Sequence, residues 1–177
     1  MEKKKNFGEL ILTSIYFAVR MVFSALVAVT LSGYMKRYAD EGQSAGSFFT
    51  PSPYGIMLRS FYSDIIEVLI CGFLFVLTLA CYIMVKKRIS EGKEINRAFL
   101  YFVCWADLIC LAFKSIMAAI GVASRMFSMR MMSSVGTATM QVLGIQLGLN
   151  SLNGLVCLIL AVALAVLLWR MSRSEDE

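Results

Sequence analysis

Four long apolar stretches, separated by polar segments, dominate the pattern of residues along the chain. They cover about Ile11–Ser32, Ile65–Val85, Ala98–Ile120 and Leu149–Trp169. A helix needs about 20 mostly apolar residues to cross the roughly 30 Å hydrocarbon core of a bilayer, and each stretch has that length. The pattern therefore predicts an all-α, polytopic membrane protein with a four-transmembrane-helix bundle. We expect residues 1–10 and 171–177 to be cytoplasmic ends, and residues 11–170 to form one membrane domain.

Two longer polar connections follow the first and third stretches, at about Gly33–Asp64 and Gly121–Gly148. The first contains GQSAGSFFTPSPYG, whose Gly, Ser and Pro content is typical of loops and turns. The second contains four methionines: Met126, Met129, Met131 and Met132. These side chains suit an adaptable contact surface, and an amphipathic segment at the outer interface fits them equally well.

Composition agrees with a membrane location. Hydrophobic residues make up 59% of the 177 residues and charged residues 16%, whereas soluble domains average about 45–50% and about 25%. Because the apolar residues come in runs of bilayer length, a larger soluble core does not explain the excess. We expect an integral membrane protein of the plasma membrane.

The distribution of lysine and arginine predicts an orientation. The N-terminal segment, the short connection between the second and third stretches, and the C-terminal end hold ten of them: Lys3, Lys4, Lys5, Lys86, Lys87, Arg88, Lys93, Arg97, Arg170 and Arg173. The two longer connections hold five: Lys36, Arg37, Arg59, Arg125 and Arg130. The positive-inside rule then predicts both termini in the cytoplasm. The net charge of +5 is explained by this bias and by contact with anionic lipid, so nucleic acid is not expected as a partner.

Two charged residues of opposite sign lie deep in the predicted spans. Arg20 and Asp107 each follow the start of their span by nine residues, or about 13 Å at 1.5 Å per residue. A charge at bilayer depth costs about 2.5–3.5 kcal/mol on insertion scales, which favours pairing over two separately hydrated charges. We expect an intramembrane ion pair between Arg20 and Asp107.

Glu67 and Lys114 form a second candidate pair nearer the outer edge. Lys114 lies two helical turns beyond Asp107, and Glu67 lies just inside the outer end of its span. A contact between them and separate snorkelling of each side chain are both compatible with these depths.

A buried ion pair has a structural and a functional interpretation. It can fix which helices are neighbours, or it can line a path for ions or protons. The expected second and fourth spans supply almost no hydrophilic face for a pore, which favours the structural interpretation.

Small residues at helical spacing mark candidate packing faces. Ser115, Ala119 and Ala123 recur every four residues in the third span, and Gly144 and Gly148 form a GxxxG before the fourth. Such spacing lets helices approach closely, within one chain or between copies.

Catalytic and metal-binding patterns are missing from the sequence. The chain has no histidine, and its five cysteines all lie in the apolar stretches: Cys71, Cys81, Cys104, Cys110 and Cys157. Histidine is the commonest metal ligand and general base, so we expect no enzymatic activity, no metal site and no cofactor.

The combination of Arg20 in the first span, Asp107 within WADLICLAFKSIMAAIGVA and a short inner connection resembles the Casparian strip membrane domain (CASP) proteins and their CASP-like relatives. These are distantly similar to the MARVEL four-span proteins. The resemblance covers about residues 11–169 and implies the Arg20–Asp107 pair. It also implies a non-enzymatic membrane platform that self-associates and recruits other proteins.

Three functions stay open on the sequence alone. The leading one is a scaffold or assembly protein that forms homo-oligomers or binds other membrane proteins through its helices and outer loops. The second is an oligomeric channel or transporter subunit. The third is an accessory subunit of a larger membrane complex, which has the same sequence features as the scaffold.

Overall fold

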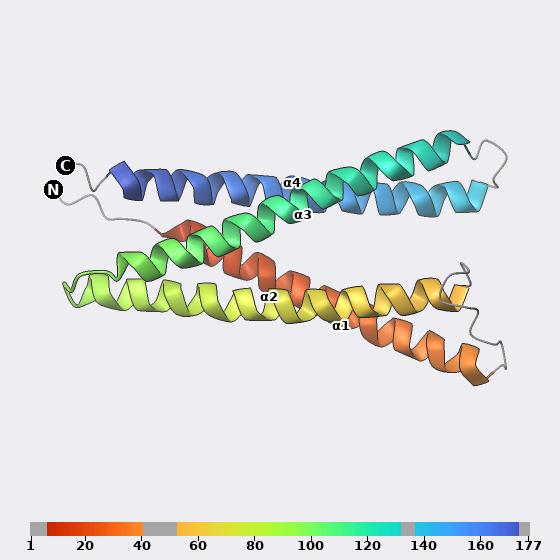
Figure 1. The fold of residues 1–177 in the computed structure, drawn as a ribbon, viewed down its shortest axis with the longest axis horizontal. Helices are drawn as coiled ribbons and strands as arrows, with labels where there is room; N and C mark the ends of the chain where they lie inside the picture. Colours follow the sequence, from red (N-terminus) through yellow and green to blue (C-terminus); the bar gives the residue numbers. More distant parts are fainter. Residues whose placement is uncertain (1–6, 41–52, 132–136, 174–177) are drawn as a thin grey trace. The chain divides into compact units, whose positions relative to one another are not determined.

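The computed structural model describes residues 7–40, 53–131 and 137–173, and every regular element in these ranges is a helix. The helices are α1 (Gly8–Asp40), α2 (Pro53–Ser90), α3 (Arg97–Met131) and α4 (Thr137–Arg173). All four are long and apolar enough to cross a membrane, over Gly8–Arg37, Leu58–Ser90, Arg97–Ser124 and Leu147–Arg173. The prediction of an all-helical chain with four such helices is confirmed (Figure 1).

The helices extend beyond the expected spans. Of the stretch predicted as loop and turn, GQSAGSFFTPSPYG, residues 42–52 lie outside the described residues, and the prediction was wrong for residues 53–55 because α2 already begins at Pro53. The rest of the expected first connection is helical where it is described, since α1 continues to Asp40 and α2 covers residues 53–64. Pro53 suits the first position of a helix, where its missing N–H has no intrahelical partner. α3 and α4 also extend into the expected second connection, at about Gly121–Gly148. α3 continues to Met131, and α4 begins at Thr137. Adding a residue to an existing helix costs little, so helices run past the apolar stretch into the polar flank.

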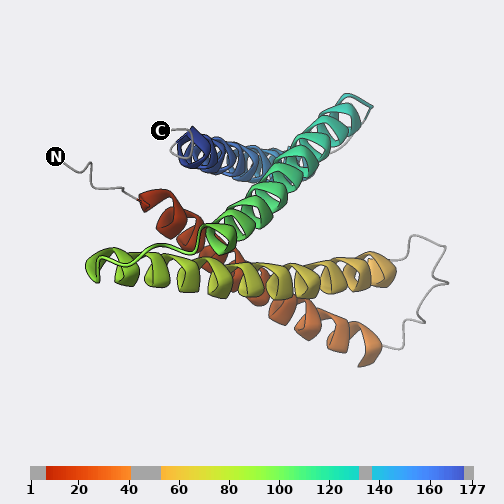
Figure 2. The same ribbon diagram turned by 60° about the vertical axis from the view of Figure 1, so that its left-hand side comes forward.

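The chain divides into two compact units. The α1–α2 unit contains α1 from Ile11 onward and α2 up to Ala80. The α3–α4 unit contains both of those helices, the start of α1 and the end of α2 from Cys81. Figures 1 and 2 show α1 beside α2, and α3 beside α4.

Each helix buries one stripe and exposes large apolar side chains on the rest of its surface. On α4 the buried positions recur at helical spacing: Cys157, Leu160, Ala161, Leu164, Leu167 and Leu168. Its exposed face carries Leu155, Leu158, Ile159 and Val162 among others. Exposed apolar surface on this scale is unstable in water but is expected where a helix faces lipid. The fold is therefore that of an integral membrane protein.

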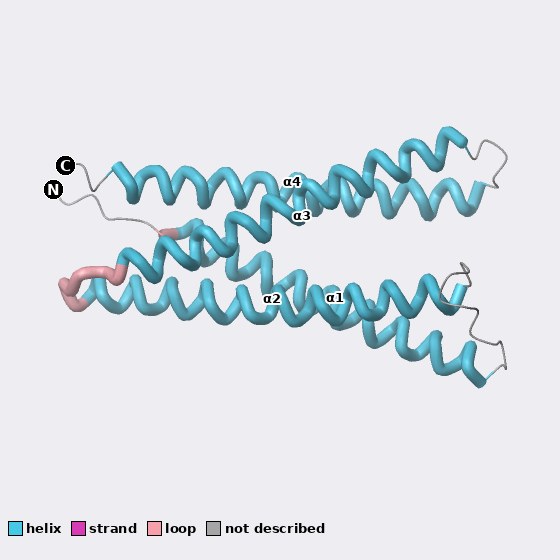
Figure 3. Tube along the Cα trace, in the orientation of Figure 1, coloured by secondary structure: helices cyan, strands magenta, loops and turns pink. Residues whose placement is uncertain are grey.

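The connection between α2 and α3 has a defined backbone structure (Figure 3). Gly92 has a positive φ of 64°, and the amides of Gly92 and Lys93 donate to the carbonyls of Ile89 and Arg88. This pair of bonds is a Schellman motif, whose left-handed position favours glycine because glycine has no Cβ. At the other end Asn96 caps α3, since its Oδ1 accepts the amide of Phe99 at 3.2 Å.

Candidate functional site

A close contact between two charged groups within the membrane spans lies in the α1–α2 unit. Arg20 Nη2 lies 2.6 Å from Glu67 Oε1, and Arg20 Nε donates to the same oxygen at 3.2 Å. The two side chains are only 23% and 22% exposed. Because a lone charge at this depth is costly, contact between the two opposite charges is favoured. The guanidinium also lies 5.7 Å from the centre of the Phe23 ring, which adds a cation–π contact.

Close packing of α1 against α2 accompanies this ion pair. A Cβ added to Gly72 would lie 3.2 Å from Met21 Sδ, so Gly72 leaves room for the methionine beside Arg20. The small residue and the ion pair together fix the register of the two helices.

The N-terminal part of α2 carries a polar face that the sequence pattern did not predict. Ser60, Asp64 and Glu67 follow one another at helical spacing. A cleft of about 570 Å³ opens between this face and α1, and its lining residues are Val27, Leu31, Arg59, Ser60, Ser63 and Asp64. The expectation that the second span has almost no hydrophilic face concerned Ile65–Val85 and stays a prediction, whereas Ser60 and Asp64 lie on the part of α2 that precedes Ile65.

A close contact between small residues joins α3 to α4. Ser115 Oγ donates a hydrogen bond to the main-chain oxygen of Gly154 at 3.2 Å. A Cβ on Gly154 would lie 2.9 Å from Ala118 Cβ, so only glycine fits there without a shift of the helices. Gly121 on α3 is near Asn150 on α4, at 3.7 Å from an added Cβ to the amide nitrogen.

The other predicted packing residues lie elsewhere. Ala119 and Ala123 are exposed on α3, and Gly148 is exposed on α4 with no atom within 4 Å of an added Cβ. Gly144 belongs to α4, but its surroundings lie outside the described residues. The sequence pattern thus predicted Ser115 as a packing residue but did not predict Ala118 or Gly154. Other small residues occur close to these two along the chain, and only the direction in which each side of the helix faces distinguishes them.

The two predicted cross-span pairs stay predictions. Arg20 and Asp107 belong to different units, as do Glu67 and Lys114. Asp107 is fully buried on α3 and Lys114 is half-buried on the same helix. The sequence did not predict the Arg20–Glu67 pair, because the depth of Glu67 was estimated from the start of the apolar stretch at Ile65. The helix that carries Glu67 begins earlier, at Pro53.

Polar side chains in the spans also bond to their own helix. Thr78 Oγ1 donates to the carbonyl of Leu74 at 2.7 Å, and Thr30 and Ser151 make the same bond four residues back. Such bonds remove the cost of placing a hydroxyl in lipid. None of the five cysteines forms a disulfide, and the described residues contain no group of three or more metal-binding side chains.

Comparison of the chain with known protein families, with curated proteins and with solved structures finds no match.

Proposed function

We propose that the chain is a non-enzymatic scaffold of the plasma membrane that assembles with further copies of itself. Its ends face the cytoplasm, as the lysine and arginine distribution indicates. The four-span arrangement and the resemblance to CASP-like proteins support the same proposal.

The observation that carries self-association is the outward position of Ala119 and Ala123. Both lie on α3, one turn apart and exposed, whereas Ser115 and Ala118 are already in contact with α4. In a bilayer, large apolar side chains gain little by meeting each other, since lipid is equally apolar. Small residues allow close backbone approach and so favour a second helix over lipid. A second copy of α3 is the partner that we propose.

The test measures the mass of the full-length protein extracted in a mild detergent. We expect a homogeneous oligomer for the wild type. Replacing both alanines by isoleucine (Ala119→Ile with Ala123→Ile) should shift the population toward the monomer by at least tenfold in dissociation constant, about 1.4 kcal/mol.

Ala165→Ile is the matched control, because Ala165 is an exposed alanine on α4. It should leave the mass unchanged. A monomeric wild type, or an oligomer that both variants leave intact, would contradict the proposed contact. A single copy held by other proteins would instead favour the accessory-subunit function.

A channel or transporter subunit is the second candidate, and the polar face of α2 favours it. Asp64 and Glu67 are one turn apart, and the cleft reaches Ser60 and Arg59 at the end of the span. Arg20 opposes Glu67 at the inner end of this face. If the face lines a path, Glu67→Gln should change the conductance of the protein reconstituted in planar bilayers, and Ser151→Ala on α4 should not. Absence of conductance in the wild type would exclude this function.

A further inference from the structure

A cavity of about 560 Å³ lies at the end of the α3–α4 unit where α1 begins and α4 ends. It lies within a single unit of the chain. Its lining residues are Phe7, Lys93, Glu94, Ile95, Asn96, Arg97, Leu100 and Met171. The volume is within the usual range of small-ligand pockets, about 300–1,000 Å³.

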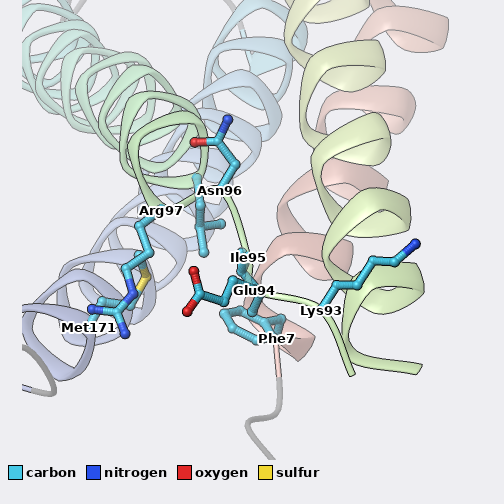
Figure 4. A pocket seen from close by; sticks show the side chains of 8 residues that line it. Phe7, Lys93, Glu94, Ile95, Asn96, Arg97 and Met171 are labelled. Carbon is cyan, nitrogen blue, oxygen red and sulfur yellow. The ribbon is translucent and has the colours of Figure 1, made fainter. Parts of the chain in front are cut away.

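One side of this cavity is apolar and built from the core. Phe7 and Leu100 are 7% and 2% exposed, and Ile95 and Met171 are half-buried. The other side holds charge of both signs. Figure 4 shows the guanidinium of Arg97 beside Met171, and the carboxylate of Glu94 between Arg97 and Phe7.

Lys93 does not add a second cation to the cavity. Its side chain points away from the other lining residues in Figure 4, and its Nζ lies 2.8 Å from Glu91 Oε2. The charged side chains directed toward the cavity are therefore those of Arg97 and Glu94.

The backbone that carries these two charges is held in place before any ligand binds. The Schellman motif at Gly92 and the Asn96 cap fix both ends of the connection. Arg88 Nη1 also donates to the main-chain oxygen of Glu94 at 2.8 Å. A preorganised site loses less conformational entropy on binding.

We propose that this cavity binds the headgroup of phosphatidylethanolamine from the adjoining leaflet. The cavity lies at the ends of membrane-spanning helices, which is the depth of lipid headgroups. Arg97 binds the phosphate through its fork of N–H donors, and Glu94 accepts the N–H groups of the ammonium. The glycerol and upper acyl chain contact Phe7 and Leu100.

The same charges disfavour the other common headgroups. Choline has no N–H group to donate to Glu94, and glycerol has no positive charge. The serine headgroup brings a carboxylate close to Glu94, and like charges repel. The predicted order of binding is ethanolamine, then serine, then choline and glycerol.

The experiment is native mass spectrometry of the full-length protein with equal amounts of lipids that share acyl chains and differ in headgroup. Wild-type protein should carry ethanolamine lipid in clear excess over choline and glycerol lipids. Glu94→Gln should reduce the ethanolamine-to-choline ratio about fivefold to tenfold, because it removes one charge-assisted contact. Arg97→Gln should reduce the binding of all four lipids.

A matched variant outside the cavity controls for loss of charge alone. Arg173→Gln makes the same change as Arg97→Gln on an exposed side chain and should leave the lipid ratios unchanged. Equal or stronger binding of the glycerol lipid by wild-type protein would overturn the proposal, as would an unchanged ratio in Glu94→Gln. Soluble glycerophosphoethanolamine that binds as tightly as the lipid would overturn the assignment to the membrane.

Discussion

At the scale of single residues, the Arg20–Glu67 ion pair is the most consequential feature of the structure. Two N–H groups of Arg20 converge on one carboxylate oxygen at a depth where neither charge is stable alone. From the sequence we expect Arg20 to have an acidic partner, and we predict that this partner is Asp107. The sequence could not identify Glu67 as an acidic partner of Arg20, because several acidic residues occur in the spans and only helix register decides which of them Arg20 meets. The pair with Asp107 stays a prediction.

Charge reversal distinguishes the two partners. Arg20→Glu and Glu67→Arg should each lower the free energy of unfolding by about 2–3 kcal/mol, since each places like charges together in the membrane. The double reversal of Arg20 and Glu67 should recover most of that loss. Thermal unfolding in detergent is the measurement, with Arg59→Gln on the exposed end of α2 as control.

The same single and double charge reversals, with Asp107 in place of Glu67, complete this test. Arg20→Asp combined with Asp107→Arg should not recover stability if Glu67 is the partner of Arg20. Recovery in that pair, together with no recovery in the Glu67 pair, would contradict the ion pair in the structure.

At the scale of helices, the contact between α3 and α4 depends on which glycines face a neighbour. The sequence contains several small residues at suitable spacing in both helices. It does not show which of them face inward, because α4 is apolar on all sides and has no hydrophobic periodicity to read. The four helices were therefore predictable from their apolar stretches, and the buried face of α4 was not.

A series of glycine-to-alanine substitutions tests the helix contacts. Gly154→Ala should lower the free energy of unfolding by about 1–3 kcal/mol, because its Cβ would lie 2.9 Å from Ala118 Cβ and overpack the contact. Gly72→Ala should cost less, since its nearest neighbour is the flexible end of Met21. The midpoint of thermal unfolding in detergent reports each change.

Gly148→Ala serves as the control for this series. No atom lies within 4 Å of its added Cβ, and alanine is the better helix former by about 1 kcal/mol. It should leave stability unchanged or slightly raised. Equal losses for Gly148→Ala and Gly154→Ala would contradict the close approach of α3 and α4.

At the scale of the whole molecule, the described residues form four helices that are long and apolar enough to cross a membrane. The number and approximate position of the spans follow from the apolar stretches, since nothing else explains such runs in a chain of this composition. The cavity beside Arg97 could not be predicted, because it joins the start of α1, the α2–α3 connection and the end of α4. Residues so far apart in the sequence share a site only through the tertiary fold.

The most direct test of this account is the sidedness of the connections, measured with single cysteines and a membrane-impermeant maleimide. Ser90→Cys, exposed at the end of α2, should be labelled only after the cells are permeabilised. Ser44→Cys, between α1 and α2, should be labelled in intact cells. The natural cysteines lie within the spans and should stay unlabelled, as the unsubstituted protein would show. Labelling of Ser90→Cys in intact cells, or of both variants from the same side, would contradict the four-span topology with cytoplasmic ends.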